Sequence, residues 1–187
     1  VVPNTDPRPY PQVMEAWAHF DDAQMERTVR AVLDAQTANT PTLVSGLKAG
    51  SYDRYDAMRR SPQAALLPRY FAEVVWHPTE GLPRDISAAN LDNLKVALAA
   101  EMRLVKRLHD EGATLHIGTD TLTAFVVPGI DMHEEMRLFA DAGIPLDAVW
   151  KIATTGNAGA LSPGLGRLDP GAPADFLIFR EDPTQSL

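Results

Sequence analysis

The chain has 187 residues, of which 45% are hydrophobic, and this length and composition suit one domain with a substantial core. Its formal net charge is -8, from 25 acidic and 17 basic residues without a lysine or arginine cluster, which argues against nucleic acid and anionic membrane and favours a small molecule or another protein as partner. No cysteine is present, so disulfides, thiolate zinc sites and a cysteine nucleophile are excluded.

The beginning of the chain carries no targeting signal. It starts at Val1 without a signal peptide, and no apolar run approaches the roughly 20 residues of a membrane span. We therefore expect that Val1 lies inside a longer protein or follows a processing step, and the cellular location stays undetermined. Residues 1–11 contain four prolines and are expected to form a loop.

A helix is predicted next, with Asp21 or Asp22 as its N-terminal cap. Residues 41–47, PTLVSGL, combine β-branched and apolar residues and predict a strand closed by Gly46. Residues 48–90 form a long, proline-containing connection for which two interpretations are open. It is either a functional lid or site loop with helical pieces, or a surface excursion with a small core of its own.

The clearest helix covers residues 90–112, where apolar side chains recur every three or four positions and Gly112 provides the stop. The short strand TLHIG, residues 114–118, follows at once. The next helix begins near Asp131, which resembles a capping box with Glu134, and it ends at Gly143.

The last part of the chain predicts two short helices within residues 144–162 and a strand, a Pro-Gly turn and a strand within residues 166–179. Strands and helices therefore alternate along the chain. This order indicates the α/β class.

Asp120 stands at the tip of the predicted strand. If residues 114–120 are extended, Asp120 shares a face with His116 and Gly118, and Gly118 leaves room beside the carboxylate. Chemistry in parallel α/β folds gathers at the carboxyl ends of strands, which favours Asp120 as a site residue. The alternative is an ordinary helix cap or turn residue.

Three histidines need separate interpretations. His116 is too far along an extended strand from Asp120 to share one metal ion with it and is predicted to be a core residue. His133 begins HEEMR, which resembles the zinc motif HExxH but has Arg137 in place of the second histidine. His133 and His77 are therefore candidates for substrate contact only, with plain solvent exposure as the alternative for both.

Three stretches in order resemble the C-terminal part of the amidohydrolase superfamily, especially its imidazolonepropionase-like and prolidase-like members. They are LHIGTDT, DMHEEMRLFADAGIPLDAVWKIATTGNAGAL and GRLDPGAPADFLIF. The matching positions are Gly118-Thr119-Asp120, His133 with Glu135, Ala153-Thr154 with Asn157 and Ala158, and Gly166 through Ala174-Asp175.

The resemblance implies a (β/α)8 barrel with a small β-sandwich, and one or two divalent metal ions, typically zinc. It implies that Asp120 is the aspartate of strand eight, which ligates the metal, takes a proton from the metal-activated water and passes it to the leaving nitrogen. The substrate class it implies is an amide, a cyclic amide or a peptide, cleaved at its C-N bond.

The chain is too short for a whole barrel, and no HxH pair occurs in it. We therefore expect a C-terminal fragment: residues 1–163 would be part of the barrel, with strands seven and eight, and residues 164–187 would begin the β-sandwich. Such a fragment is expected to hold no metal, to be inactive alone and to associate, possible homo-oligomers included, through uncovered strand edges. The alternative function is a non-catalytic α/β binding or assembly domain derived from the same barrel.

Overall fold

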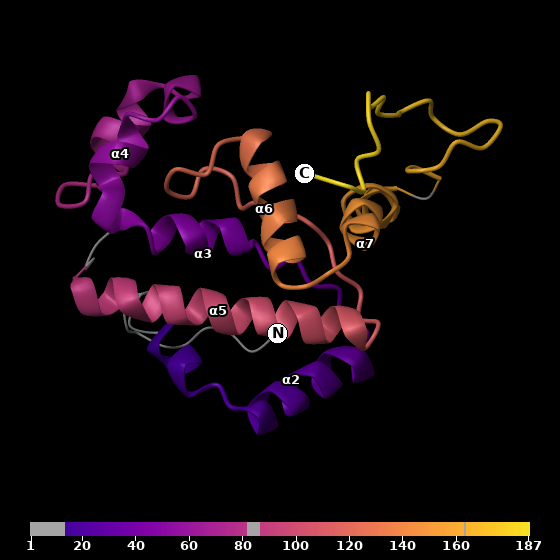
Figure 1. Ribbon diagram of the computed structural model, residues 1–187, viewed down its shortest axis with the longest axis horizontal. Helices are drawn as coiled ribbons and strands as arrows, with labels where there is room; N and C mark the ends of the chain where they lie inside the picture. The colour runs from indigo at the N-terminus through magenta and orange to yellow at the C-terminus, as the bar shows by residue number, and fades with distance from the viewer. Residues whose placement is uncertain (1–13, 82–86, 163) are drawn as a thin grey trace.

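Helix α5 (Ala88–Asp110) is the longest element and runs through the middle of the molecule (Figure 1). Helix α2 (Asp22–Asp34) lies along one side of it, and α3 (Leu43–Ala49) and α6 (Ile130–Asp141) lie along the other (Figure 1). This computed structural model describes residues 14–81, 87–162 and 164–187, so the loop predicted for residues 1–11 lies outside the described part.

The remaining described elements are short helical pieces. They are η1 (Met14–His19), η2 (Tyr52–Arg54), α4 (Tyr55–Arg59), η3 (Ala64–Leu66), η4 (Phe71–Val75), α7 (Leu146–Lys151), η5 (Ile152–Gly156) and α8 (Asn157–Leu161). Among the helices of the described ranges, none has the length and apolar character that a membrane crossing requires.

Local sequence accounts for α2 and α5, which confirm two predicted helices. The Asp21 side chain accepts the Gln24 N–H at 2.7 Å, and the Gln24 side chain accepts the Asp21 N–H at 2.9 Å, a complete capping box for α2. Ser87 caps α5 by accepting the N–H of Asn90 at 3.4 Å.

The main core lies where α3, α5 and α6 meet. Val44, Val126, Phe139 and Val149 are each 0% exposed and belong to one continuous apolar cluster. Close packing of this kind fixes the relative positions of the helices that contribute to it.

A second, aromatic core lies in the long connection. Its centre is formed by Tyr52, Trp76 and Phe125, and the ring centroids of Trp76 and Phe125 lie 5.0 Å apart. The described part of residues 48–90 thus forms helical pieces around a core that it shares with Leu91, Leu94 and Phe125, and the choice between a site loop and a surface excursion stays open.

The predicted barrel strands do not occur in the described ranges. Residues 43–49 are helix α3, and the segment 114–118 pairs at a single point, the parallel bridge between Asn39 and Leu115. The α/β fold class, as the C-terminal portion of a (β/α)8 barrel, was therefore a wrong prediction. Over the residues that the structure describes, the chain is an assembly of helices without a sheet.

The physical reason is that a strand needs a neighbour, which a local pattern cannot guarantee. Thr42 turns the chain with a left-handed φ of 53°. The N–H groups of Leu43 and Val44, which a strand would offer to a neighbouring strand, are bound instead by the carboxylate of Glu135. Leu43 and Val44 of this segment are still buried, but from a helix.

The β-sandwich segment predicted for residues 164–187 is also wrong. Residues 166–179 are irregular, with a turn at residues 170–171 and no strand, and the segment projects from the helices (Figure 1). The side chains of Phe176, Leu177, Ile178 and Phe179 are 61%, 67%, 86% and 44% exposed. The division of the chain at residues 163 and 164 stays a prediction.

Helix α6 begins in a way that the sequence did not indicate. Gly129, with a φ of 79°, precedes it, and no side chain caps it, so the predicted capping box of Asp131 and Glu134 is wrong. Asp131 accepts the N–H of Val127 instead. The predicted end of this helix at Gly143, which has a φ of 98°, is confirmed.

Candidate functional site

Asp120 lies on a tight turn after a buried segment. Leu115 and Ile117 are 5% and 3% exposed, whereas Asp120 is exposed and has a left-handed φ of 52°. Its backbone carbonyl accepts the N–H of Thr123 at 3.1 Å and the hydroxyl of Thr123 at 2.9 Å. The turn is thus held through the backbone of Asp120, and the carboxylate stays at the surface.

The buried segment before Asp120 is held from two sides. The Asn157 side chain accepts the N–H of Ile117 at 3.0 Å and donates to its carbonyl at 2.6 Å. A Cβ atom at Gly118 would lie 2.7 Å from the Cγ2 atom of Thr40. Glycine therefore permits close packing on residue 40, which differs from the predicted role of making room beside Asp120.

Glu135 is the most deeply buried polar side chain near this turn. It is 0% exposed, and its two carboxylate oxygens accept the N–H groups of Leu43 at 2.9 Å and Val44 at 2.6 Å. Burial raises the pKa of Glu135 to about 7, the two backbone hydrogen bonds oppose this rise, and the charge of Glu101 adds to it. Glu135 is therefore an ionisable group near neutrality inside the core.

Glu101 of α5 faces the same helix α3 from another side. Its Oε2 atom lies 3.6 Å from the place that a Cβ atom of Gly46 would take. Burial raises the pKa of Glu101 to about 7. Both Glu101 and Glu135 thus lie against helix α3, and burial raises the pKa of each.

Asp131 forms a second buried polar contact from α6. It is 2% exposed, accepts the N–H of Val127 and pairs with Lys48 of α3, whose Nζ lies 2.9 Å from the Asp131 carboxylate. Because Val127 follows the Asp120 turn, Asp131 and Glu135 connect α6 to both α3 and that loop.

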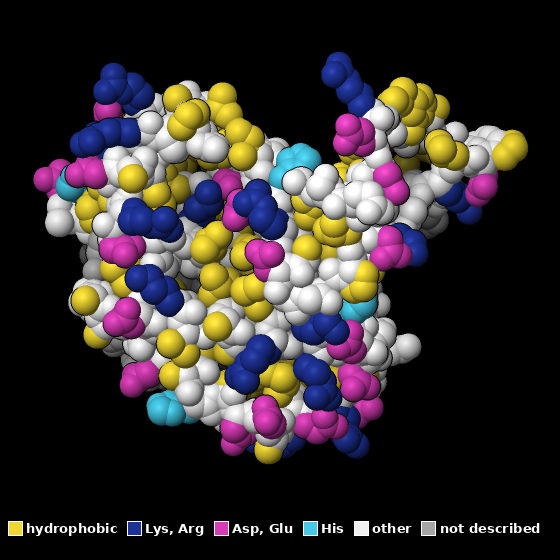
Figure 2. All heavy atoms as spheres, in the orientation of Figure 1, with side chains coloured by type: hydrophobic (Ala, Val, Ile, Leu, Met, Phe, Trp, Pro, Cys, Tyr) yellow, Lys and Arg dark blue, Asp and Glu magenta, His cyan; other side chains and the backbone are white. Residues whose placement is uncertain are grey.

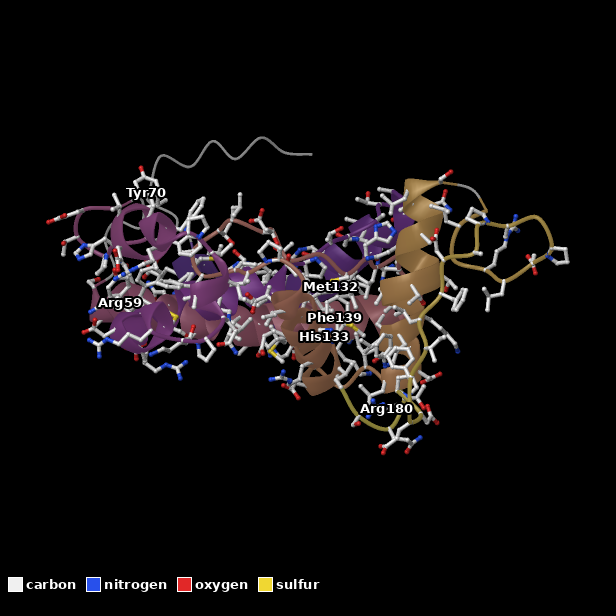
Figure 3. All side chains as sticks on the ribbon, turned by 90° about the horizontal axis from the view of Figure 1, so that it is seen from above. Arg59, Tyr70, Met132, His133, Phe139 and Arg180 are labelled. Carbon is white, nitrogen blue, oxygen red and sulfur yellow. The ribbon has the colours of Figure 1, made fainter. Side chains whose placement is uncertain are left out.

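The two histidines proposed for substrate contact lie in different parts of the molecule. His133 is exposed on α6, and Figure 3 shows it near Met132, well away from Arg59 and Tyr70 of the lobe that residues 52–76 form. His77 belongs to that lobe: its ring meets Tyr55 edge-on, with centroids 5.5 Å apart, and its Nδ1 lies 3.2 Å from the Thr79 hydroxyl. His116, predicted in the core, is half-buried.

An open groove of about 540 Å³ lies between α2 and α5, where Figure 2 shows apolar surface flanked by basic side chains. Its walls include Arg103, Lys106 and Arg107, but Lys106 pairs with Asp110, and Arg107 pairs with the exposed Glu26 at 3.2 Å. Asp120 does not line it. The groove and the Asp120 turn are separate features.

Among the described residues, the Asp120 turn, α3 and α6 form one connected region, in which Glu135 and Asp131 are buried. The family described as "Amidohydrolase family" matches residues 27–186, most of the chain and all of this region. The chain belongs to the amidohydrolase family. No curated protein and no solved structure matches it.

Membership assigns this amidohydrolase to a class of hydrolases, in which divalent metal ions are generally used. Among the described residues, however, no three His, Asp or Glu side chains come close enough to hold a metal ion. Asp120, His77 and His133 therefore do not form a ligand set, and the residues present do not fit a metal centre. We derive no catalytic step through a metal.

Sequence reasoning missed the buried carboxylates of this amidohydrolase. Glu135 stood in the matched His-x-Glu pattern, but its role depends on Leu43 and Val44, about ninety positions earlier in the chain. Asn157 also stood in a matched motif, where its bonds to Ile117 were not foreseen. The local signal for Glu135 was a carboxylate on an otherwise apolar helix face. The same pattern also occurs where a carboxylate forms a salt bridge, so it does not indicate bonds to the backbone of another helix.

Proposed function

We propose that this member of the amidohydrolase family takes part in the hydrolysis of a C-N bond in an amide, a cyclic amide or a peptide, with Asp120 as its catalytic carboxylate. The observation that supports this is the presentation of Asp120: an exposed carboxylate on a turn fixed by two hydrogen bonds to its own carbonyl. A catalytic group needs such a fixed position to act on a bound substrate.

The chemistry is general acid-base catalysis. The Asp120 carboxylate accepts a proton from the attacking water as its oxygen bonds to the carbonyl carbon, and it returns that proton to the nitrogen as the C-N bond breaks. Water is thereby added across the bond, and Asp120 ends in its original ionised form.

We propose further that Asp120 would be one ligand of a divalent ion in a more complete protein, and that this chain alone neither holds the ion nor turns over substrate. The ligand role is what the resemblance of Gly118-Thr119-Asp120 to the family implies. The lack of an ion in this chain alone rests on the described residues, which form no group of three His, Asp or Glu side chains able to hold one. Zinc content and hydrolysis of cyclic amides and dipeptides, measured on the purified 187-residue chain, test this proposal. Stoichiometric zinc together with turnover would refute it.

The role of Asp120 itself is tested in the protein expressed from the complete gene. Asp120→Asn keeps the shape of the side chain but removes its basicity, so we expect turnover to be lost and the circular dichroism spectrum to be kept. Asp147→Asn, at an exposed aspartate of α7 paired with Lys151, is the matched control and should keep full activity. Activity retained in Asp120→Asn would remove this residue from the mechanism.

We propose His133 and His77 as substrate contacts. His133 is exposed and available, whereas the ring of His77 already contacts Tyr55 and Thr79. Substitution of a residue that only contacts substrate should raise KM more than it lowers kcat.

A second candidate function, partner binding or assembly, is favoured by one observation. The four consecutive apolar side chains of residues 176–179 are all exposed. We propose self-association through this segment as the alternative, and Ile178→Asp should then convert an oligomer to a monomer in sedimentation velocity. The same variant with unchanged sedimentation would leave hydrolysis as the single proposal.

A further inference from the structure

Two carboxylates of α6 point into the protein. Asp131 is 2% exposed and Glu135 is 0% exposed. A buried ionisable group is costly unless its hydrogen bonds are complete, so two of them on one helix call for a physical reason. The hydrolysis proposed above uses neither of them.

A path of hydrogen bonds leads from Glu135 to the Asp120 turn. Glu135 accepts two backbone N–H groups at the start of α3, at 2.9 and 2.6 Å. Ser45, in the same turn of α3, lies with its hydroxyl 3.2 Å from the hydroxyl of Thr123. Thr123 in turn makes both hydrogen bonds to the Asp120 carbonyl.

Asp131 holds the other end of the same loop. It accepts the N–H of Val127 and pairs with Lys48 at 2.9 Å, one turn further along α3. The loop 120–127 is therefore attached to α3 through Thr123 and to α6 through Val127. Movement of α3 relative to α6 would displace both attachments together.

We propose that Glu135 is a positioning residue that holds the start of α3 against the 120–127 loop and thereby fixes the place of Asp120. The contacts concern the backbone of α3 and the side chain of Thr123, so Glu135 acts through other residues and touches no reacting atom. The catalytic meaning of this role rests on the proposed function, but the coupling itself does not.

Protonation of Glu135 gives the coupling a measurable pH dependence. The charged groups that face this region are Glu101 from α5, Lys48 from α3 and Asp131 from α6, the last two paired with each other. Burial and the charge of Glu101 raise the pKa of Glu135, so its carboxylate gains and loses its proton near neutral pH. A protonated carboxyl is a weaker acceptor for two N–H groups than a carboxylate is.

Amide NMR spectra of the 187-residue chain, recorded between about pH 5 and about pH 9, test the proposal. As the pH falls through about 7, the amide protons of Leu43 and Val44 should shift upfield, and the amide of Thr123 should shift with the same midpoint. In Glu135→Gln these shared shifts should be lost, and any shift of the Leu43 and Val44 amides that persists without Thr123 is assigned to Glu101, whose pKa burial also raises to about 7. The neighbouring Glu134→Gln, which removes a carboxylate paired with Arg137, should titrate like the wild type.

Glu101→Gln keeps the test decisive if Glu135→Gln does not fold. Without the Glu101 charge the midpoint of the Leu43 and Val44 amides should fall, and that of Thr123 should follow it. A Thr123 midpoint that stays unmoved, or an unchanged Thr123 titration in Glu135→Gln, would overturn the proposal. The NMR shifts are measured without turnover. If they are absent, the coupling is wrong, and the role of Asp120 is still decided by the Asp120→Asn assay. If Asp120→Asn is active, the proposed hydrolysis by Asp120 is wrong, and the coupling is still decided by the shifts.

Discussion

Replacement of Glu135 by glutamine should change how the stability of the protein depends on pH. Burial raises the pKa of this carboxyl from 4.5 to about 7 in the folded state. Each unit of difference between the folded and unfolded pKa corresponds to about 1.4 kcal/mol, so protonation of Glu135 contributes about 3 kcal/mol to the free energy of unfolding. Because Glu135 is 0% exposed, solvent screening does not reduce this magnitude in the way that it does at a surface.

The sign follows from where the proton binds. Between pH 4.5 and about 7 the folded protein holds a proton on Glu135 that the unfolded chain has released. The stabilisation by protonated Glu135 is therefore complete below pH 4.5 and is lost as the pH rises through about 7. The free energy of unfolding of the wild type, minus that of Glu135→Gln, should fall by about 3 kcal/mol over this range.

Urea denaturation followed by circular dichroism at a series of pH values measures this difference. Surface carboxylates whose pKa is lowered, such as Asp56 beside Arg59, make stability rise with pH. Subtraction cancels their contribution, because the wild type and Glu135→Gln both contain them. Glu134→Gln serves as the control and should give a difference that does not vary with pH through neutrality. Parallel curves for the wild type and Glu135→Gln would refute the reasoning, since they would mean that Glu135 has the same pKa folded and unfolded.

Two further substitutions test the framework around Asp120. Asn157→Ala should lower the free energy of unfolding, measured by urea denaturation, by about 3 kcal/mol, because the N–H and the carbonyl of the buried Ile117 both lose their hydrogen-bond partner. A loss below about 1 kcal/mol would contradict a stabilising role of these two hydrogen bonds. Gly166 has a φ of 73°, and an added Cβ would lie 2.7 Å from Ala158 Cβ and 2.9 Å from Thr155 Cα. Gly166→Ala should therefore loosen the packing of residues 167–187 on the helices and speed their limited proteolysis. Wild-type cleavage rates would contradict that packing.

Local signals predicted helices α2 and α5. The capping box of Asp21 and the regular apolar spacing before Gly112 act within a few residues, so the sequence alone contains them, and α2 and α5 occur as predicted. The strands failed for the opposite reason. The segment 41–47 has strand-like composition, but its backbone donors are bound by Glu135, a residue that no local pattern connects to it.

In the candidate site, too, local features were predicted and contacts between distant residues were not. Asp120 was found because a carboxylate after a short apolar segment is a local pattern, and the matched motifs drew attention to it. The residues that hold it in place, Asn157 and Glu135, act on backbone groups about forty and about ninety positions away. Only the folded structure brings such partners together, so their roles could not be predicted from spacing.

The way in which Asp120 is held has a consequence for tolerance to mutation. In a sheet, the position of a strand end is secured by a ladder of backbone hydrogen bonds that survives most side-chain changes. Over the described residues, the segment before Asp120 makes one bridge, with Asn39, and the side chain of Asn157 holds Ile117. After Asp120, Glu135 acts through α3 on Thr123. Each anchor depends on one residue. Single substitutions at these two positions should therefore displace Asp120 more than substitutions of the apolar residues around them, whose packing is shared among many neighbours.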